Sequence, residues 1–420
     1  MAKLIFYLFL FLSYVAFSNA INPSAYVPPS VILNNKYFVE IEQEIRVGFR
    51  LFDVSSLNND SKTINYRNLQ YATDSPRILV PRVVANKNKL FFFGTNGHDI
   101  LETTLMFSFD INEGTWNELK DVNMPSHIYP YQEENFVGPD SEGNAYLLYN
   151  DNNIMLSFNT ETLKWSQYSI QSFVPTDYAY YSWYTATILP DGNIAYIGGK
   201  FSNGTSFVDA LMNQFYIYDT KIHVWSAKST LGTTPGPRNG HSASLTSDGS
   251  RIIVYGGMNA NGQPSNPSLA VLNINNSEWS SPQVTNPIGS VWLTPSVIID
   301  NYMFLYVGIN ITTSVQNAFD KVFMLDTSTY TWNTLDPVAY NSNENIFGNG
   351  KNQLADARPD TNRSDDLTVT LMIILIVIGS ILILMIFAFT FYKLYQTRRH
   401  KVGQQKVIMD HSHNQPQSQV

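Results

Sequence analysis

The sequence predicts an all-β domain, a six-bladed β-propeller of four-stranded antiparallel blades, followed by one C-terminal transmembrane helix. Three observations predict it: a strand-turn-Trp segment recurs about every 50 residues, a hairpin pattern precedes each copy, and one long apolar run lies near the C-terminus. We expect a signal peptide at residues 1–20, the propeller at 21–338, a flexible stalk at 339–366, the transmembrane helix at 367–392 and a cytoplasmic tail at 393–420.

The two apolar ends of the chain predict its topology. Lys3 precedes an apolar run, and Ser18 and Ala20 supply the small residues that a signal-peptide cleavage site needs. Residues 367–392 carry no charge and exceed the ~20 residues that cross a membrane as a helix. Aspartates precede this run and basic residues follow it, so the tail stays in the cytoplasm. The chain therefore reads as a type I single-pass membrane protein with an extracellular or lumenal N-terminal domain.

Charge and cysteine content narrow the function classes. The chain has 26 basic and 34 acidic residues; without Lys3 and the tail's five bases and Asp410, the N-terminal domain keeps 20 against 33, a net charge of −13. This excess disfavours nucleic acid or anionic lipid as its main partner. Cysteine is absent, so a large core must stabilise the domain without disulfides.

Glycosylation sequons are the next feature of the predicted extracytoplasmic part. An Asn-x-Ser/Thr sequence makes a side-chain amide available to glycosylation in that compartment. The candidates are Asn59, Asn203, Asn275, Asn310 and Asn362.

The repeat itself consists of an apolar alternating strand, an Asp or Asn, a polar turn, and a Trp that opens another strand. Five copies end on Trp116, Trp165, Trp225, Trp279 and Trp332, which are 49, 60, 54 and 53 residues apart. A sixth, earliest copy has Asp53 in the turn and Tyr66 where the Trp would fall. The predicted blades, called the first to sixth repeats below, are 29–68, 76–121, 127–169, 178–229, 237–283 and 290–336.

Paired glycines end the hairpin of two repeats, Gly198-Gly199 in the fourth and Gly256-Gly257 in the fifth, and Arg238 to His241 precede the fifth repeat's first strand. This pattern resembles the kelch repeat, and the chain is similar to the single-pass kelch-domain membrane proteins numerous in some fungi. The resemblance covers residues 25–338; the second and sixth repeats keep one glycine, and the first and third keep neither. It implies a propeller in which the glycines allow close backbone approach and each Trp packs between neighbouring blades.

The sequence contains few residue patterns that are typical of an enzyme active site. Kelch architecture is shared by galactose oxidase, whose copper cofactor requires a Tyr crosslinked to a Cys, and this chain has no Cys. The histidines of the N-terminal domain, among them His223 and His241, form no His-x-His pair, and we expect the His411 and His413 pair of the tail to bind no metal. The segment ending at Trp116 approaches a sialidase turn, but its spacing and phase fit the repeat better. We expect no cofactor, no metal and no enzyme activity; an extracellular carbohydrate-active enzyme remains the alternative.

Binding is the function that the connections favour. Because neighbouring strands are antiparallel, the connections before each first strand and after each second strand share one face, and the long ones include 200–209 and 259–268. The candidate binding residues are Tyr180, Tyr181, Trp183, Trp292 and Arg238. Aromatic side chains there can hold a sugar ring or anchor a protein, although Trp183 can equally begin a strand and line the core. We predict an extracellular module that binds a protein or a glycan in adhesion, with any signalling left to a cytoplasmic partner of the tail.

Overall fold

The computed structural model of the chain describes residues 30–33, 36–43, 47–69, 76, 78–95, 104–120, 122–125, 136–149, 154–170, 180–202, 207–306, 309–311 and 321–340. These residues form strands, turns and bends, and no helix. The chain divides into two compact units, residues 1–354 and 355–420, and every described residue belongs to the first. The predicted signal peptide, transmembrane helix and tail lie outside the described residues, and within the described ranges no helical segment has the length and apolarity to cross a bilayer.

The first three repeats form antiparallel sheets in chain order. The first contains β1 (Ser30–Leu33), β2 (Tyr37–Gln43), β3 (Val47–Asp53) and β4 (Thr63–Asn68). The second contains β5 (Leu79–Asn86), β6 (Lys89–Thr95), β7 (Thr104–Asp110) and β8 (Thr115–Glu118). The third contains β9 (Asn144–Tyr149), β10 (Ile154–Asn159) and β11 (Lys164–Ser169), and Val137 bridges Tyr146 where a first strand was expected.

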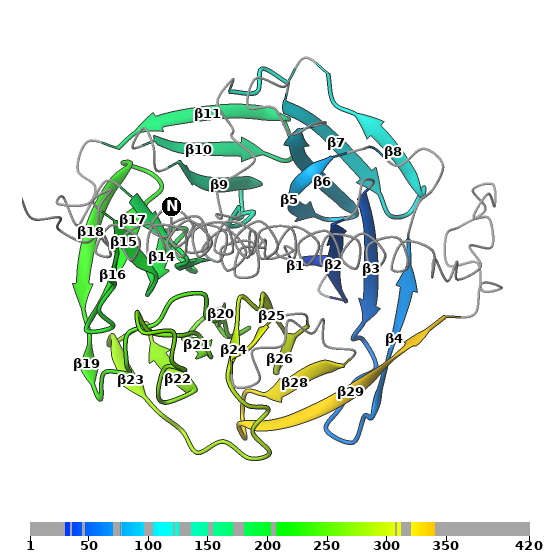
Figure 1. Cartoon of the computed structure of the whole chain (residues 1–420). Helices are drawn as coiled ribbons and strands as arrows, with labels where there is room; N and C mark the ends of the chain where they lie inside the picture. Colours follow the sequence, from blue (N-terminus) through cyan, green and yellow to red (C-terminus); the bar gives the residue numbers. More distant parts are fainter. Residues whose placement is uncertain are drawn as a thin grey trace, which may run out of the picture. The chain divides into compact units, whose positions relative to one another are not determined.

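The last three repeats continue the pattern. The fourth contains β13 (Thr185–Ile188), β14 (Ile194–Ile197), β17 (Gln214–Asp219) and β18 (Val224–Ser229). The fifth contains β20 (Ser242–Leu245), β21 (Arg251–Tyr255), β22 (Leu269–Asn273) and β23 (Glu278–Ser280). The sixth contains β25 (Ser296–Ile299), β26 (Tyr302–Leu305), β28 (Val322–Asp326) and β29 (Thr331–Ala339). Figure 1 shows these sheets following one another around a propeller-like ring.

An Asp or Asn at the end of the third strand shapes the turn that follows in every repeat. The Oδ1 atom of Asp110 accepts a hydrogen bond from the backbone N–H of Asn112 at 2.9 Å, an Asx turn that the chain can form locally. The same bond is made by Asp53, Asn159, Asp219, Asn273 and Asp326. This turn fixes the register of the fourth strand, and in the first repeat it pairs Phe52 with Tyr66, where the other repeats pair a Trp.

The fourth-strand tryptophans pack in clusters that join two successive repeats. Trp116 lies against Phe49 of the first repeat, with ring centroids 6.2 Å apart, and Trp332 lies 4.8 Å from Tyr255 of the fifth. The Nε1 atom of Trp279 also donates a 2.8 Å hydrogen bond to the carbonyl of Met212 in the fourth repeat. Burial of such large side chains at 1–6% exposure for the last three tryptophans holds one sheet to the next.

The first and sixth repeats share both a core cluster and a sheet. Phe38 and Phe52 lie in one cluster with Val297 and Phe304, and the end of β29 pairs in parallel with β4, which joins the two repeats into an eight-stranded sheet. The backbone N–H of Tyr340 donates to the carbonyl of Tyr66 at 2.9 Å. The sheet therefore continues past residue 338, where the sequence placed the end of the domain, because the edge of β4 offers it hydrogen-bond partners.

Two further parallel contacts of this kind occur between later repeats. Residues that follow a fourth strand pair with the fourth strand of the next repeat, as β19 (Leu231–Gly232) does with β23 and Thr285 does with Thr331. The junction of the sixth and first repeats thus uses the same contact as the junctions of the fourth with the fifth and of the fifth with the sixth.

Candidate functional site

The connections between strands carry short strands of their own at one end of the fourth to sixth repeats. β12 (Tyr180–Ser182) pairs with β15 (Lys200–Ser202), which pairs with β16 (Phe207–Asp209). In the sixth repeat β24 (Val291–Trp292) pairs with β27 (Ile309–Asn310), and in the fifth Asn239 bridges Met258, which bridges Pro264. We call these short strands, Trp183 and residues 239–240 and 258–264 the connection face. The connections that the sequence placed on one face are thus hydrogen-bonded to each other.

Two of the candidate binding residues, Trp183 and Trp292, meet on the connection face. Their ring centroids are 5.3 Å apart with planes at 83°, the edge-to-face arrangement that the ring quadrupoles favour. The ammonium of Lys200 lies 4.7 Å from the centroid of a Trp183 ring, a cation–π contact. Both indoles are half-buried. The pair joins the fourth repeat to the sixth, so it exists only because the sheets come together.

The fifth repeat passes beneath this pair through Gly240. The N–H of Gly240 donates to the carbonyl of Trp183 at 2.9 Å, and the carbonyl of Gly240 accepts from the N–H of Leu293 at 2.7 Å. Trp183, Gly240 and Leu293 all have positive φ, of 54°, 58° and 53° respectively. A Cβ atom on Gly240 would lie 2.1 Å from Nε1 of Trp292, so only glycine leaves room for this indole.

A polar network fixes Asn239 and, through it, Trp292. Nε1 of Trp292 donates to Oδ1 of Asn239 at 3.3 Å, and Nδ2 of Asn239 donates to the carbonyl of Met258 at 2.7 Å and to Oδ1 of Asp209 at 3.1 Å. The other carboxylate oxygen of Asp209 accepts from the N–H of Ala260. By contrast, the buried Nε1 atom of Trp183 has no hydrogen-bond partner among the described residues.

The glycine pairs dock each repeat on the next. The N–H of Gly199 donates to the carbonyl of Arg238, and that of Gly257 donates to the carbonyl of Val291, both at 2.8 Å. A Cβ atom on Gly256 would lie 2.3 Å from the Val291 carbonyl oxygen. These positions therefore need both the positive φ and the missing side chain of glycine, and they hold the connection face in place.

Tyr181 and Arg238 are equivalent residues in the interior. Each is fully buried and donates to the carbonyl of the first glycine in its own repeat: the Tyr181 hydroxyl to Gly198 at 2.6 Å and Arg238 Nη1 to Gly256 at 3.1 Å. The guanidinium also donates to the carbonyl of Pro267 at 2.8 Å, and burial lowers its pKa to about 10. Neither side chain reaches the surface, and each supports the backbone of its repeat through the carbonyl of the first glycine.

His241 is another buried group below the face. Its Nε2 atom lies 3.0 Å from the Thr185 hydroxyl, while Nδ1 has no hydrogen-bond partner among the described residues. Burial, with a smaller contribution from the Arg238 charge, lowers the pKa of His241 to about 3. The imidazole is therefore neutral at physiological pH, and its lone position in the core gives it a packing role.

The remaining candidate positions are dispersed. Asn203 and Asn362 lie outside the described residues. The side chains of Tyr180 and Asn310 also lie outside the described part of the chain. Asn275 is exposed, although the hydroxyl of its sequon partner Ser277 is buried. Asn59 is exposed as a residue, but its amide donates to Asp326 at 2.8 Å across the junction of the first and sixth repeats.

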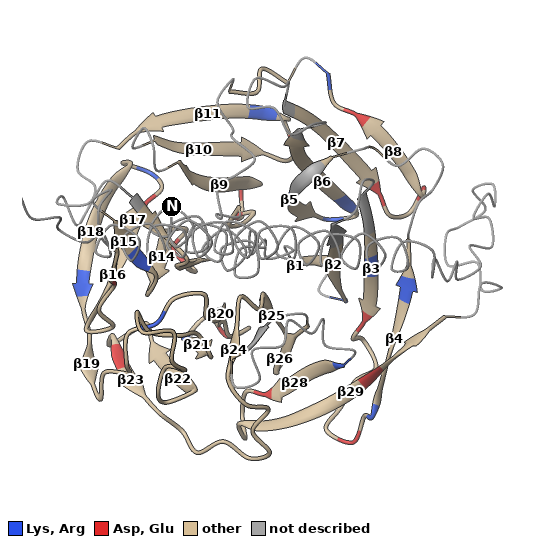
Figure 2. Cartoon of the chain, viewed as in Figure 1, with Lys and Arg blue, Asp and Glu red and all other residues tan. Residues whose placement is uncertain are grey.

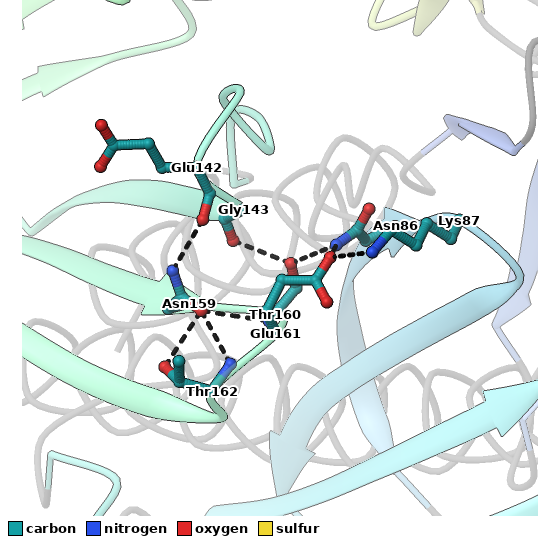
Figure 3. A network of polar contacts seen from close by, with 8 residues as sticks. All are labelled: Asn86, Lys87, Glu142, Gly143, Asn159, Thr160, Glu161 and Thr162. Carbon is teal, nitrogen blue, oxygen red and sulfur yellow. Dashed lines mark hydrogen bonds and ion pairs between the residues drawn. The ribbon is translucent and has the colours of Figure 1, made fainter.

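The turns at the other ends of the strands form a different kind of region. Figure 3 shows the network that joins the second and third repeats, which we call the turn network. Nδ2 of Asn86 donates to the Thr160 hydroxyl at 2.7 Å and to Glu161 at 2.9 Å, and the Lys87 ammonium lies 2.7 Å from the same carboxylate. The Thr160 hydroxyl donates to the carbonyl of Gly143 at 2.8 Å. Each of these polar groups is used within the chain.

The described residues bring together no group of three His, Asp or Glu side chains that could hold a metal ion. Figure 2 shows basic and acidic residues of the described strands interspersed around the ring instead of gathered by sign. The connection face therefore offers aromatic rings, one ammonium and backbone groups.

Residues 184–345 match the family described as KLHDC2/KLHL20/DRC7 Kelch-repeats domain. The matched segment starts in the fourth repeat and includes both glycine pairs and Trp292. This segment is thus similar to kelch repeats, and it contains most of the connection face. The solved structure of YjhT is similar with a TM-score of 0.50 and 12% identity, over 74% of this chain and 97% of that one, which shows the fold alone.

Curated relatives are similar over parts of the chain. Acyl-CoA-binding domain-containing protein 4 of Arabidopsis thaliana is 27% identical over 242 residues, 55% of this chain and 34% of that protein. Rab9 effector protein with kelch motifs of Homo sapiens is 26% identical over 123 residues, 29% of each. Kelch domain-containing protein 3 of Rattus norvegicus is 30% identical over 105 residues, 24% of this chain and 25% of that protein. The chain spans at most about a third of the length of these relatives.

Sequence reasoning missed the hairpin β15–β16, and with it Lys200 and Asp209. The stretch was expected to be a loop, and Asn203-Gly204, a dipeptide common in hairpin turns, is the sequence signal that could have indicated the two strands. Asn239, in contrast, has no sequence signal of its role, because its partners come from distant connections.

Proposed function

We propose that this chain is a type I single-pass membrane protein that presents a six-bladed kelch propeller outside the cell or in a lumen. In this proposal the propeller is a non-catalytic module, and it binds a partner protein through its connection face.

Closure into six blades is supported by the way the core clusters run from one repeat to the next. Clusters join the first repeat to the second, the second to the third, the third to the fourth, and onward to the sixth. A further cluster joins the sixth to the first, and β29 pairs with β4 there. A sheet with two apolar faces needs a neighbour on each side, and a closed ring supplies both.

The single observation that carries the binding role is the Trp183–Trp292 pair with Lys200 above it. Half-buried aromatic side chains on rigid short strands provide contact area at little entropic cost, and Trp is the residue most enriched in interface hot spots. One relative is named Rab9 effector protein with kelch motifs, which is consistent with kelch repeats that act by protein contact.

Crosslinking on cells that express the full chain tests this function. Wild type should capture a specific partner, and the double variant Trp183→Ala/Trp292→Ala should lose at least about tenfold of that capture, since hot-spot truncations cost ~2 kcal/mol or more. The control is Lys87→Ala in the turn network, which should capture as wild type does. Equal capture by the double variant, or release of the partner by a glycan competitor alone, would contradict a protein-binding face.

The topology has its own test, independent of the ligand. An epitope after residue 20 should be accessible to antibody on intact cells, and one after residue 410 only after permeabilisation. The reverse pattern, or release of the chain from membranes by carbonate, would contradict the type I anchor.

A further inference from the structure

β16 is an exposed apolar strand beside the tryptophan pair. Phe207 is 68% exposed, Val208 is 45% exposed, and Leu211, just after the strand, is 57% exposed. Because Phe207 and Val208 point to opposite faces of the strand, β16 exposes one large apolar side chain on each face, and Leu211 adds a third just beyond its end; leaving them in water costs free energy.

Among the described strands, the main chain of β16 also has an unpaired edge. β16 is the last strand of the sheet β12-β15-β16, and no strand of the described residues pairs with its outer side. The N–H of Ala210 bonds to the carbonyl of Gly199, and Phe201 lies opposite Val208 in the same register. Since hydrogen-bonded pairs alternate in an antiparallel ladder, Phe207 and Asp209 direct their N–H and C=O groups away from β15.

The equivalent segment of the fifth repeat is protected, which makes β16 unusual within the chain. There Pro264 occupies the edge position opposite Met258, and a proline has no N–H to offer a further strand. The residues around it, Asn259, Asn261 and Gln263, are polar. The same architecture is thus blocked in one repeat and open in another.

The positive charge of Lys200, beside the edge of β16, favours a partner with an acidic side chain. Lys200 lies directly opposite Asp209 in the ladder, but both carboxylate oxygens of Asp209 accept hydrogen bonds from the fifth repeat. The Lys200 ammonium forms no ion pair with any described residue and rests on Trp183. A carboxylate on a strand paired with β16 would lie close to this cation and to Phe207.

We propose that β16 docks an extended segment of the partner protein, which adds as a strand to the edge formed by Phe207–Asp209. Apolar side chains on the two faces of the added strand pack beside Phe207 and Val208, and an Asp or Glu side chain on the Phe207 face pairs with Lys200. This proposal rests on the proposed function, because it names the chemistry by which the connection face holds its protein.

A peptide selection tests the proposal without knowledge of the natural partner. The probe is a displayed library of random peptides about twelve residues long, selected on the purified full chain in detergent micelles. Enriched peptides should carry apolar residues at adjacent positions and an acidic residue, and binding should slow hydrogen exchange at the amides of Phe207 and Asp209. Replacing a single peptide amide that faces β16 by an ester should weaken binding about fivefold to tenfold, the loss expected for one hydrogen bond.

Two variants of Phe207 separate the contribution of the main-chain edge to binding from that of the side chain. Phe207→Ala removes the ring and keeps the N–H, whereas Phe207→Pro also removes the outward N–H and leaves the pairing of Val208 with β15. Phe207→Pro should bind the selected peptides about fivefold to tenfold more weakly than Phe207→Ala. Ile222→Ala is the matched control, since Ile222 is 67% exposed at the opposite turn, and it should bind as wild type does. Equal affinities for the two Phe207 variants would overturn strand addition.

Failure of this inference can be told from failure of the proposed function. If Trp183→Ala/Trp292→Ala loses the cellular partner while Phe207→Pro keeps it, the face binds protein but not through β16. If the peptide-free chain self-associates and Phe207→Pro abolishes that, the edge is covered by a second copy and the proposal is wrong. Charge pairing is tested by Lys200→Gln, which should weaken acidic peptides only.

Discussion

The connection face and the turn network lie at opposite ends of the strands, and they satisfy their polar groups differently. In the turn network Asn86, Thr160 and Glu161 bond to one another and to the backbone. On the connection face the Lys200 ammonium lies over a Trp183 ring and forms no ion pair with any described residue. The comparison teaches that a closed set of hydrogen bonds serves the fold, while a cation without a carboxylate on the same scaffold is open to a partner.

The two regions also use glycine differently, which leads to the largest expected effect. Gly256→Ala would place a Cβ 2.3 Å from the carbonyl oxygen of Val291 at φ 70°, and backbone cannot move aside easily. We expect a loss of roughly 3 kcal/mol in the free energy of unfolding, from strain and overpacking together. Gly143→Ala in the turn network would meet only side-chain atoms of Glu161 and Thr160 at 3.0–3.1 Å, so roughly 1 kcal/mol is expected.

Denaturant unfolding of the purified variants measures this difference. Gly262→Ala is the control for backbone conformation alone, because Gly262 has the same φ of 70° and nothing within 4 Å of its Cβ position. If Gly256→Ala costs no more than Gly262→Ala, close docking of the fifth repeat on the sixth is not what requires glycine.

The second-largest expected effect is a pH dependence of the free energy of unfolding, caused by His241 below the connection face. The pKa of His241 falls from 6.5 to about 3 on folding, so between these values the unfolded chain binds the proton more tightly. His241 therefore places no cost on stability above pH 6.5, and it destabilises the fold by about 1.4 kcal/mol per pH unit as the pH falls below that value. Its neighbours, Arg238 and the Thr185 hydroxyl, offer no negative charge to offset protonation.

Unfolding free energies of wild type and His241→Gln, compared from pH 7 to pH 4, isolate this contribution. The carboxylates titrate alike in both proteins, including Glu161, whose pKa the Lys87 and Asn86 contacts lower. We expect the wild type to lose stability more steeply below pH 6.5. Parallel curves would mean that His241 is solvated or gains a counter-charge.

The smallest effects belong to the turn network. Asn86→Ala should cost about 1 kcal/mol, because the amide bonds the buried Thr160 hydroxyl. Lys87→Ala should leave the unfolding curve unchanged within error, since the Lys87 side chain is 72% exposed and its ion pair is screened. Thermal melts of both variants check this order, and a larger loss for Lys87→Ala would reverse our view of the network.

Much of the fold could be predicted from sequence because its signals are local. The strand-turn-Trp pattern located the repeats, the Asx turns that the Asp and Asn residues form set their registers, and the glycine pairs indicated close backbone approach. The pairing of β29 with β4, by contrast, is non-local, and no local pattern in the sequence indicates it.

The site was predicted only in part. Trp183 and Trp292 were named separately, and their meeting depends on contacts among three repeats that no local pattern encodes. Tyr181 and Arg238 look like surface residues by type, yet each caps a glycine carbonyl in the interior. Their burial follows from equivalent positions in successive repeats, which becomes visible only in the structure.

Site-specific photocrosslinking tests the central claim most directly. A photoreactive phenylalanine analogue replaces Trp292 on the connection face or Lys87 in the turn network of the full chain, and cells that express each protein are irradiated. Our account predicts a crosslinked partner protein from position 292 and none from position 87. Crosslinks from position 87 alone, or equal yields from both positions, would contradict it.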